Sequence, residues 1–310
     1  MERLPSKSLS RLLDPLNRLY RHRIAKKIAM ALRDTPITAN QVTLAHTCVG
    51  VSTASMVFFK HYVLAVLFLE LRTILDCTDG ILARLKGSAT PFGRTLDTIG
   101  DGVTFNALMI AGALRIILDF PGYRPSLILI AVFFFAMIAA HCGSVYMLMK
   151  RKLGSIILEQ IDTVEREWRE QAAKVYGETS SWISRFGYWL DTFTIRFVSE
   201  EWYEKIKKRR KAEDWEARAL SDATTMNELA RKTRKTEFDH AVRFTAFVSD
   251  DNIFAVMSLS FLLTEAFPLT IFPHVHPVLI AFSAGFAYAI LSLILGLHYL
   301  HVFYHGVYRD

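Results

Sequence analysis

Long apolar runs alternate with charged segments along the chain. Asp, Glu, Lys and Arg are absent from Val42–Phe59, Pro125–Met149 and Pro277–Tyr308. These runs approach or exceed the roughly 20 apolar residues that a helix needs to cross the hydrocarbon core of a bilayer. The pattern predicts an all-α integral membrane protein.

Turn residues and charges between the apolar runs divide the chain into six expected transmembrane helices. Three of these helices contain charged residues, which weakens their hydropathy signal but does not interrupt their apolar periodicity. The expected spans are Gln41–Phe59, Tyr62–Leu85, Gly93–Leu118, Pro125–Met149, Asn252–Phe272 and Pro277–Tyr304.

Two further segments lie outside the spans, one before the first span and one between the fourth and the fifth. Ser8–Arg33 has aliphatic residues every three or four positions with Arg and Lys between them, which predicts an amphipathic helix in the membrane interface. A polar stretch of about 100 residues separates the fourth and fifth spans and is expected to be helical. The chain then divides into four parts: an N-terminal juxtamembrane segment (1–40), spans one to four with the four aspartates (41–150), a cytoplasmic insert (151–251), and spans five and six with the C-terminus (252–310).

The distribution of basic residues predicts the orientation. Formal net charge is +7, and nine Lys or Arg residues lie within the first 33 positions, with three more at Lys150–Lys152. Because basic residues accumulate at the cytoplasmic ends of spans, both termini and the segment Leu71–Asp101 are expected on the cytoplasmic face. The basic surplus then faces anionic lipid, and a nucleic-acid partner is not expected. Three cysteines, all within apolar runs, predict no structural disulfide framework.

Four aspartates within 26 residues are the candidate metal ligands. Asp76 and Asp79 are three positions apart in the second span, and Asp97 and Asp101 are four apart in the third. Each pair projects from one helix face, and the short connection between the spans keeps the helices adjacent. Ionisable residues within membrane spans are costly and mark functional sites. Two divalent cations would neutralise four carboxylates, and oxygen ligands favour Mg²⁺ or Mn²⁺, as in two-metal phosphoryl-transfer sites.

Small and basic residues accompany these acids. Gly80 and Ala83 share a helix face with Asp76 and Asp79 and leave room for a ligand, and Gly93 opens the third helix on the same side. Arg84 lies one turn beyond Gly80, where it could hold a phosphate. Arg72 could contact an acceptor or a lipid phosphate, or pair with Glu70 or Glu265, and Arg94 is a weaker candidate for a substrate phosphate.

The spacing of these residues resembles a known family. Asp76-Cys-Thr-Asp79-Gly80-Ile-Leu-Ala83-Arg84, followed after eight residues by Gly93-Arg-Thr-Leu-Asp97-Thr-Ile-Gly-Asp101, is similar to the DxxDGxxAR and GxxxDxxxD motif of the CDP-alcohol phosphotransferases. Eight fixed positions match with the right gaps. The resemblance covers about Thr35–Arg151, and the insert after the fourth span departs from the compact members of the family.

The resemblance implies roles for the motif residues. In this family Asp76, Asp79 and Asp97 would bind two Mg²⁺ or Mn²⁺ ions with Asp101 beside them. Asp101 would be the catalytic base that deprotonates the attacking hydroxyl. The CDP pocket would be lined by Gly80, Ala83, Arg84 and Gly93. Family members commonly form homodimers.

The family chemistry displaces CMP from a CDP-linked alcohol by the hydroxyl of a second alcohol. Phosphatidyl transfer from CDP-diacylglycerol to a small polar alcohol is the favoured expectation. The alternative is transfer of phosphocholine or phosphoethanolamine from a water-soluble CDP-alcohol to diacylglycerol. Two other classes remain open: a cation or proton transporter that uses the acids as a pathway, and an inactive scaffold that recruits partners through the insert.

Overall fold

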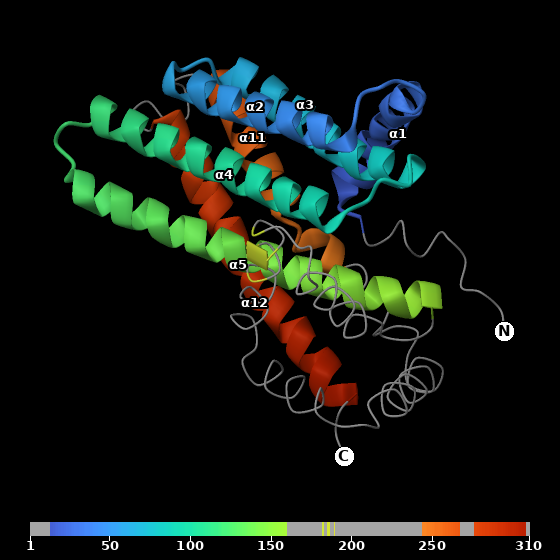
Figure 1. Cartoon of the computed structure of the whole chain (residues 1–310). Helices are drawn as coiled ribbons and strands as arrows, with labels where there is room; N and C mark the ends of the chain where they lie inside the picture. The colour runs from blue at the N-terminus through green and yellow to red at the C-terminus, as the bar shows by residue number, and fades with distance from the viewer. Residues whose placement is uncertain are drawn as a thin grey trace. The chain divides into compact units, whose positions relative to one another are not determined.

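The computed structural model describes residues 13–159, 182, 185, 186, 189, 244–266 and 276–307. These residues form helices and connections, with no strand among them. The first twelve residues and most of the expected insert lie outside the described part. After a π-helical turn at Asn17–Arg21, the helices are α1 (His22–Leu32), α2 (Ala39–Phe58), α3 (Tyr62–Leu85), α4 (Pro91–Asp119), α5 (Pro125–Glu159), α11 (Asp250–Ala266) and α12 (Pro277–Val307) (Figure 1).

The bounds of α2, α3, α4 and α12 lie within three residues of the expected spans, whereas α5 extends ten residues beyond Met149 and α11 is described only as far as Ala266. The membrane character is confirmed for part of the spans. Phe92–Asp119, Pro125–Arg151 and Pro277–His298 are long and apolar enough to cross a membrane. The chain is therefore an integral membrane protein. The charged residues of α3 lower its hydropathy, and α11 has only 17 residues, so six complete spans stay a prediction.

The chain divides into two compact units. One comprises Leu16–Ala140 and Asp251–Ile290 and contains all the motif residues, and the other comprises Met1–Pro15, His141–Asp250 and Leu291–Asp310. In the second unit, a Cβ added at Gly296 would lie 2.9 Å from Val145 and 3.1 Å from Val248, so these segments approach closely there.

Within the motif-bearing unit, α2 lies between two partners. It contacts both α3 and α4, and the three helices run side by side (Figure 1). A cluster of aromatic rings joins α4 to the remaining helices of the unit, because Phe105 packs edge-on against Phe135 of α5 and Phe254 of α11. Phe282 of α12 packs against Phe135 in the same way. This core holds α4, which carries half of the motif, in place.

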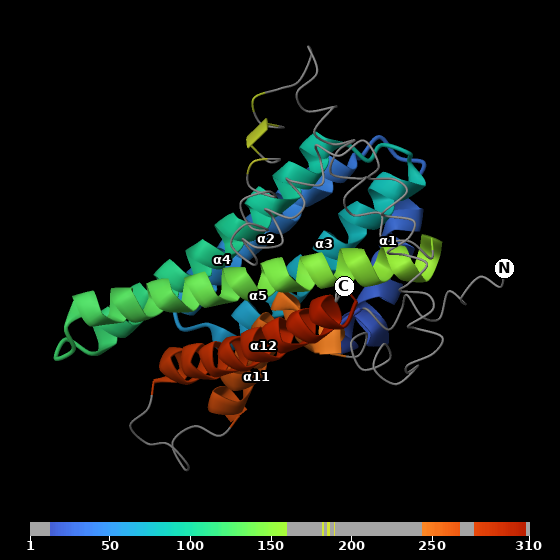
Figure 2. The same ribbon diagram turned by 90° about the horizontal axis from the view of Figure 1, so that it is seen from below.

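The α1 helix packs against α3, as Figures 1 and 2 both show. Ala25 and Ala29 are fully buried on its inner face and join the core formed by Val42, Ile81 and Leu82. The expectation that the arginines of this segment form one basic exposed face is wrong for Arg21, which is 3% exposed and donates from Nε and Nη2 to Glu70 at 2.7 and 2.6 Å. Ile24 and Met30 are exposed. A location of this helix in the membrane interface stays a prediction.

Candidate functional site

Side-chain caps determine where α2 and α4, two of the three helices that carry the site, begin. Thr38 and Gln41 form a reciprocal capping box at the start of α2. Thr90 Oγ1 accepts a hydrogen bond of 3.0 Å from the Gly93 amide, and Pro91 occupies the first position of α4. Such caps satisfy amide groups that have no partner within the helix. They fix the register in which Asp97 and Asp101 follow one and two turns after Gly93.

The end of α3 is fastened to the connection before α2. Lys86 Nζ donates to the carbonyl oxygens of Thr35 and Ile37 at 2.6 and 2.7 Å. Gly87 follows with φ of +60°, a conformation that favours glycine. The chain therefore turns sharply after the first half of the motif and leads directly into the second.

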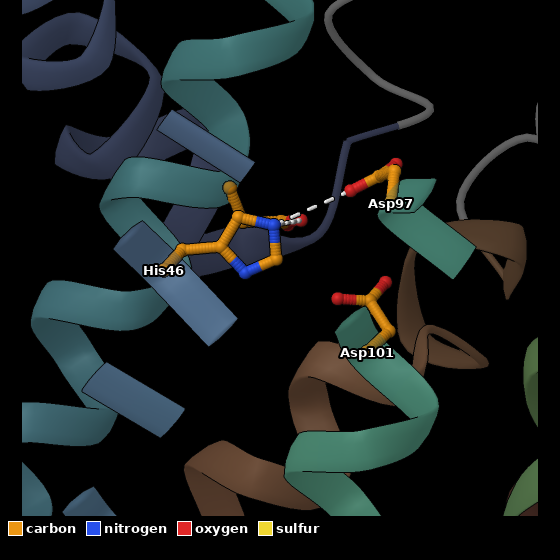
Figure 3. Close-up of side chains that lie close together, drawn as sticks. His46, Asp97 and Asp101 are labelled. Carbon is orange, nitrogen blue, oxygen red and sulfur yellow. Dashed lines mark ion pairs between the residues drawn. The ribbon is translucent and has the colours of Figure 1, made fainter. Parts of the chain in front are cut away.

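The structure brings three of the four aspartates together with a histidine that the sequence analysis did not select. One ligand atom from each of His46, Asp76, Asp97 and Asp101 lies within 4.8 Å of the others. The separations from His46 Nε2 are 3.9 Å to Asp76 Oδ1 and 3.5 Å to Asp97 Oδ1. Figure 3 shows the imidazole facing the two aspartates of α4. The residues present are thus able to surround a divalent cation.

Asp79 lies beside this group and is more deeply buried. Its side chain is 7% exposed, and Oδ2 accepts a hydrogen bond of 2.6 Å from Thr43 Oγ1. The same oxygen is 3.5 Å from His46 Nε2. Asp79 therefore joins the cluster through α2, whereas Asp76, Asp97 and Asp101 have partly exposed side chains.

Arg72 balances part of the negative charge. Its side chain is 3% exposed, and Nη2 contacts Asp101 Oδ1 and lies 3.9 Å from Asp76 Oδ1. Nη1 is 4.0 Å from Asp251 of α11, and the guanidinium lies over the ring of Phe254. Pairing with an acid was one of the two expectations for Arg72, and it pairs with Asp101. Of the two acids named for it, Glu70 instead bonds to Arg21 and Tyr20.

The small motif residues on α3 and α4 allow other side chains to approach the helix backbone closely. A Cβ at Gly80 would lie 3.7 and 3.8 Å from the terminal nitrogens of Arg84, so that guanidinium lies over the bare backbone of α3. A Cβ at Gly93 would be 3.0 Å from Asn40 Oδ1. Ala83 is partly buried, and Arg84 and Arg94 are exposed.

His46 and Asp251 are the members of this site that sequence reasoning missed. His46 had a detectable signal, because it is the one ionisable side chain other than Cys48 in a helix without Asp, Glu, Lys or Arg, and it shares a three- and four-residue spacing with Thr43 and Gly50. Asp251 had none, because its approach to Arg72 joins segments far apart in the chain.

Known proteins with similar sequences point to the same class of site. Residues 36–164 match the family described as CDP-alcohol phosphatidyltransferase. This match over residues 36–164 agrees with the resemblance identified from the motif.

A curated relative carries a more specific name. The chain is 33% identical over 86 residues to a phosphatidylinositol phosphate synthase of Corynebacterium glutamicum, a match that covers 27% of this chain and 39% of the relative. The chain thus matches about two fifths of that relative's length. No solved structure matches the chain.

Proposed function

We propose that the protein is a phospholipid-synthesis enzyme that transfers the phosphatidyl group of CDP-diacylglycerol to the hydroxyl of a small polar alcohol, with release of CMP. The observation that carries this proposal is the convergence of Asp76, Asp97 and Asp101, from two helices of the region that matches the CDP-alcohol phosphatidyltransferase family, within 4.8 Å of one another. The reaction forms a bond from the acceptor oxygen to the phosphorus that bears the diacylglycerol and breaks the bond from that phosphorus to CMP.

The donor set fits Mg²⁺ or Mn²⁺. Carboxylate oxygens are the ligands these ions prefer, and Asp97 Oδ1 is buried with no hydrogen-bond partner among the described residues. In this proposal two ions are held by Asp76, Asp79 and Asp97 with Asp101 beside them. Such ions neutralise charge on the pyrophosphate oxygens and on the leaving CMP.

The protein's own residues bind and orient the substrates. Arg84, whose guanidinium lies over Gly80, is placed to contact a phosphate of CDP, and the small residues Gly80, Ala83 and Gly93 would line the nucleotide pocket. Asp101 accepts the proton of the acceptor hydroxyl at its carboxylate as that oxygen attacks. Arg72 holds Asp101 through an ion pair and thereby fixes the direction of the base.

The acceptor in this proposal is a phosphorylated polyol. The name of the relative from Corynebacterium glutamicum supports a phosphatidylinositol phosphate product, and the exposed basic side chain of Arg94 lies on α4, the helix that carries Asp97 and Asp101. The site faces the cytoplasm with both termini on that side, a placement supported by the distribution of basic residues.

An acceptor screen tests the proposal. Purified protein receives labelled CDP-diacylglycerol, Mn²⁺ or Mg²⁺, and in turn inositol phosphate, glycerol phosphate, inositol and serine, and CMP release is measured together with the lipid product. We expect stoichiometric CMP and lipid product with a phosphorylated polyol. Product from CDP-choline and diacylglycerol, with none from CDP-diacylglycerol and any acceptor, would contradict it.

A further inference from the structure

We propose that His46 is a nitrogen ligand of one of the two divalent cations at the aspartate cluster, so that the metal site has mixed nitrogen and oxygen donors. This inference rests on the proposed function. It adds a residue that lies outside the eight motif positions and changes the metal preference expected of an all-carboxylate site.

The position of the imidazole fits a ligand. His46 Nε2 lies 3.5 Å from Asp97 Oδ1 and 3.9 Å from Asp76 Oδ1, and the four ligand atoms lie within 4.8 Å of one another. For metal–ligand bonds of about 2.1 Å in octahedral geometry, neighbouring ligand atoms are about 3.0 Å apart and opposite ones about 4.2 Å. The observed separations allow these atoms to close on one ion with small side-chain movements.

The burial of His46 gives an independent reason. The residue is fully buried, and neither ring nitrogen makes a hydrogen bond to a described residue. A buried polar group that makes no hydrogen bond costs free energy. Figure 3 shows the ring facing the aspartates, so a cation bound among them would be coordinated by the lone pair of Nε2.

Packing holds the ring in this direction. A Cβ built at Gly100 of α4 would overlap Thr47 Oγ1 and would lie 3.4 Å from His46 Cε1, so glycine lets α4 pass close to α2 at Thr47, with the imidazole in van der Waals contact. On α2 itself, Thr43 is engaged with Asp79. The ring therefore meets α4 at the turn between Asp97 and Asp101.

A nitrogen donor has a predictable effect on metal choice. Imidazole suits Mn²⁺, Co²⁺ and Zn²⁺ better than Mg²⁺, which prefers oxygen ligands. The site is thus expected to bind Mn²⁺ more tightly than Mg²⁺ by a margin that depends on His46. The contrasting role, in which a protonated His46 serves only as a counter-charge to the aspartates, gives no metal–nitrogen bond.

Electron spin-echo spectroscopy of the Mn²⁺-loaded full-length protein tests the bond directly. We expect ¹⁴N modulation from a coordinated imidazole, which disappears when wild-type protein is labelled with ¹⁵N-histidine and when His46 is replaced in His46→Gln. The matched control is His61→Gln, an exposed histidine just beyond the far end of the same helix, which should retain the ¹⁴N modulation. Bound Mn²⁺ without histidine modulation would overturn the inference, and the isotope experiment gives this answer even if His46→Gln does not fold.

Equilibrium metal binding supplies the second readout. His46→Gln is expected to weaken Mn²⁺ binding by about tenfold or more and Mg²⁺ binding by about threefold or less. Equal weakening of both ions, or no change, would overturn the inference while leaving the proposed function intact. Absence of Mn²⁺ binding together with metal-independent CMP release would instead refute the proposed function as well.

Discussion

Arg72 of α3 and Asp101 of α4 form an ion pair next to the proposed metal site. Arg72 also approaches Asp76 and Asp251, so a single buried guanidinium faces three carboxylates from three helices. The pair links the residue proposed as catalytic base to a side chain that is 3% exposed and cannot easily change its position.

Replacing Arg72 is expected to affect turnover more than substrate binding. Arg72→Gln releases Asp101, and misplacement of a catalytic group by about 1 Å costs about 100-fold in rate. Arg72→Lys should recover part of this loss. The measurement is the rate of CMP release against acceptor concentration: a lower kcat with unchanged KM supports positioning of Asp101. A raised acceptor KM with unchanged kcat would show instead that Arg72 contacts the acceptor. Arg124→Gln, exposed in the connection between α4 and α5, is the control.

Asp101→Asn is expected to retain the fold and lose CMP release by at least about 100-fold, because the amide cannot accept the proton of the attacking hydroxyl. Thermal unfolding in detergent checks the fold, and CMP release checks the reaction. Asp34→Asn, an exposed aspartate beyond the end of α1, is the matched control and should turn over at the wild-type rate. A wild-type rate in Asp101→Asn would refute the assignment of the base.

The pair between Arg21 and Glu70 fastens the N-terminal helical segment to α3. Burial alone would lower the pKa of the Arg21 guanidinium, but its hydrogen bonds to Glu70 outweigh burial and raise the pKa, so the group stays charged. Arg21→Met should destabilise the protein by about 3 kcal/mol, because Glu70 loses its charged partner in a partly buried position.

A double-mutant cycle with Glu70→Gln measures that coupling. Thermal unfolding in detergent should show that the two substitutions together cost less than the sum of the single ones. Arg23→Met, an exposed neighbour on the same helix, should change stability by less than about 0.5 kcal/mol. Additive effects of Arg21→Met and Glu70→Gln would contradict the importance of the pair.

Close packing of α4 against α12 depends on Gly112. A Cβ there would overlap the ring of Phe282, with 2.8 and 2.9 Å to its Cε2 and Cε1 atoms. Gly112→Ala should therefore lower stability by about 1–3 kcal/mol, the usual cost of overpacking. Gly102→Ala on the same helix meets nothing within 4 Å and should be neutral or stabilising.

A second substitution identifies the cause of the Gly112→Ala effect. Phe282→Leu removes the ring, so Gly112→Ala should cost less in that background. The measurement is the shift in Tm of the single and double variants in detergent. Equal shifts for Gly112→Ala with and without Phe282→Leu would show that the ring is not the obstacle.

Much of the fold was predictable because apolar length and turn chemistry act locally. Tyr62–Leu85 begins and ends where expected, since Lys60, with φ of 65°, and Gly87, with φ of 60°, turn the chain on either side. The inward position of Arg21 was not predictable. Its partner, Glu70, lies 49 residues away, and helical periodicity alone places an arginine on the polar face.

The aspartates of the candidate site were predictable from the sequence, whereas the position of His46 was not. The spacing of Asp76, Asp97 and Asp101 put their carboxylates on facing helix surfaces, and the structure brings them together. The participation of His46 depends on the packing of α2 against both α3 and α4, a tertiary relationship that spacing within one helix does not specify.

The dependence of CMP release on divalent cations tests the central claim most directly. Purified protein, CDP-diacylglycerol and an acceptor that supports turnover are assayed after removal of metal ions with a chelator, and again after addition of excess Mn²⁺ or Mg²⁺. We predict that CMP release falls to background without divalent cations and returns when either ion is added. Release at the full rate in the metal-free protein would contradict a mechanism in which the clustered aspartates act by holding cations.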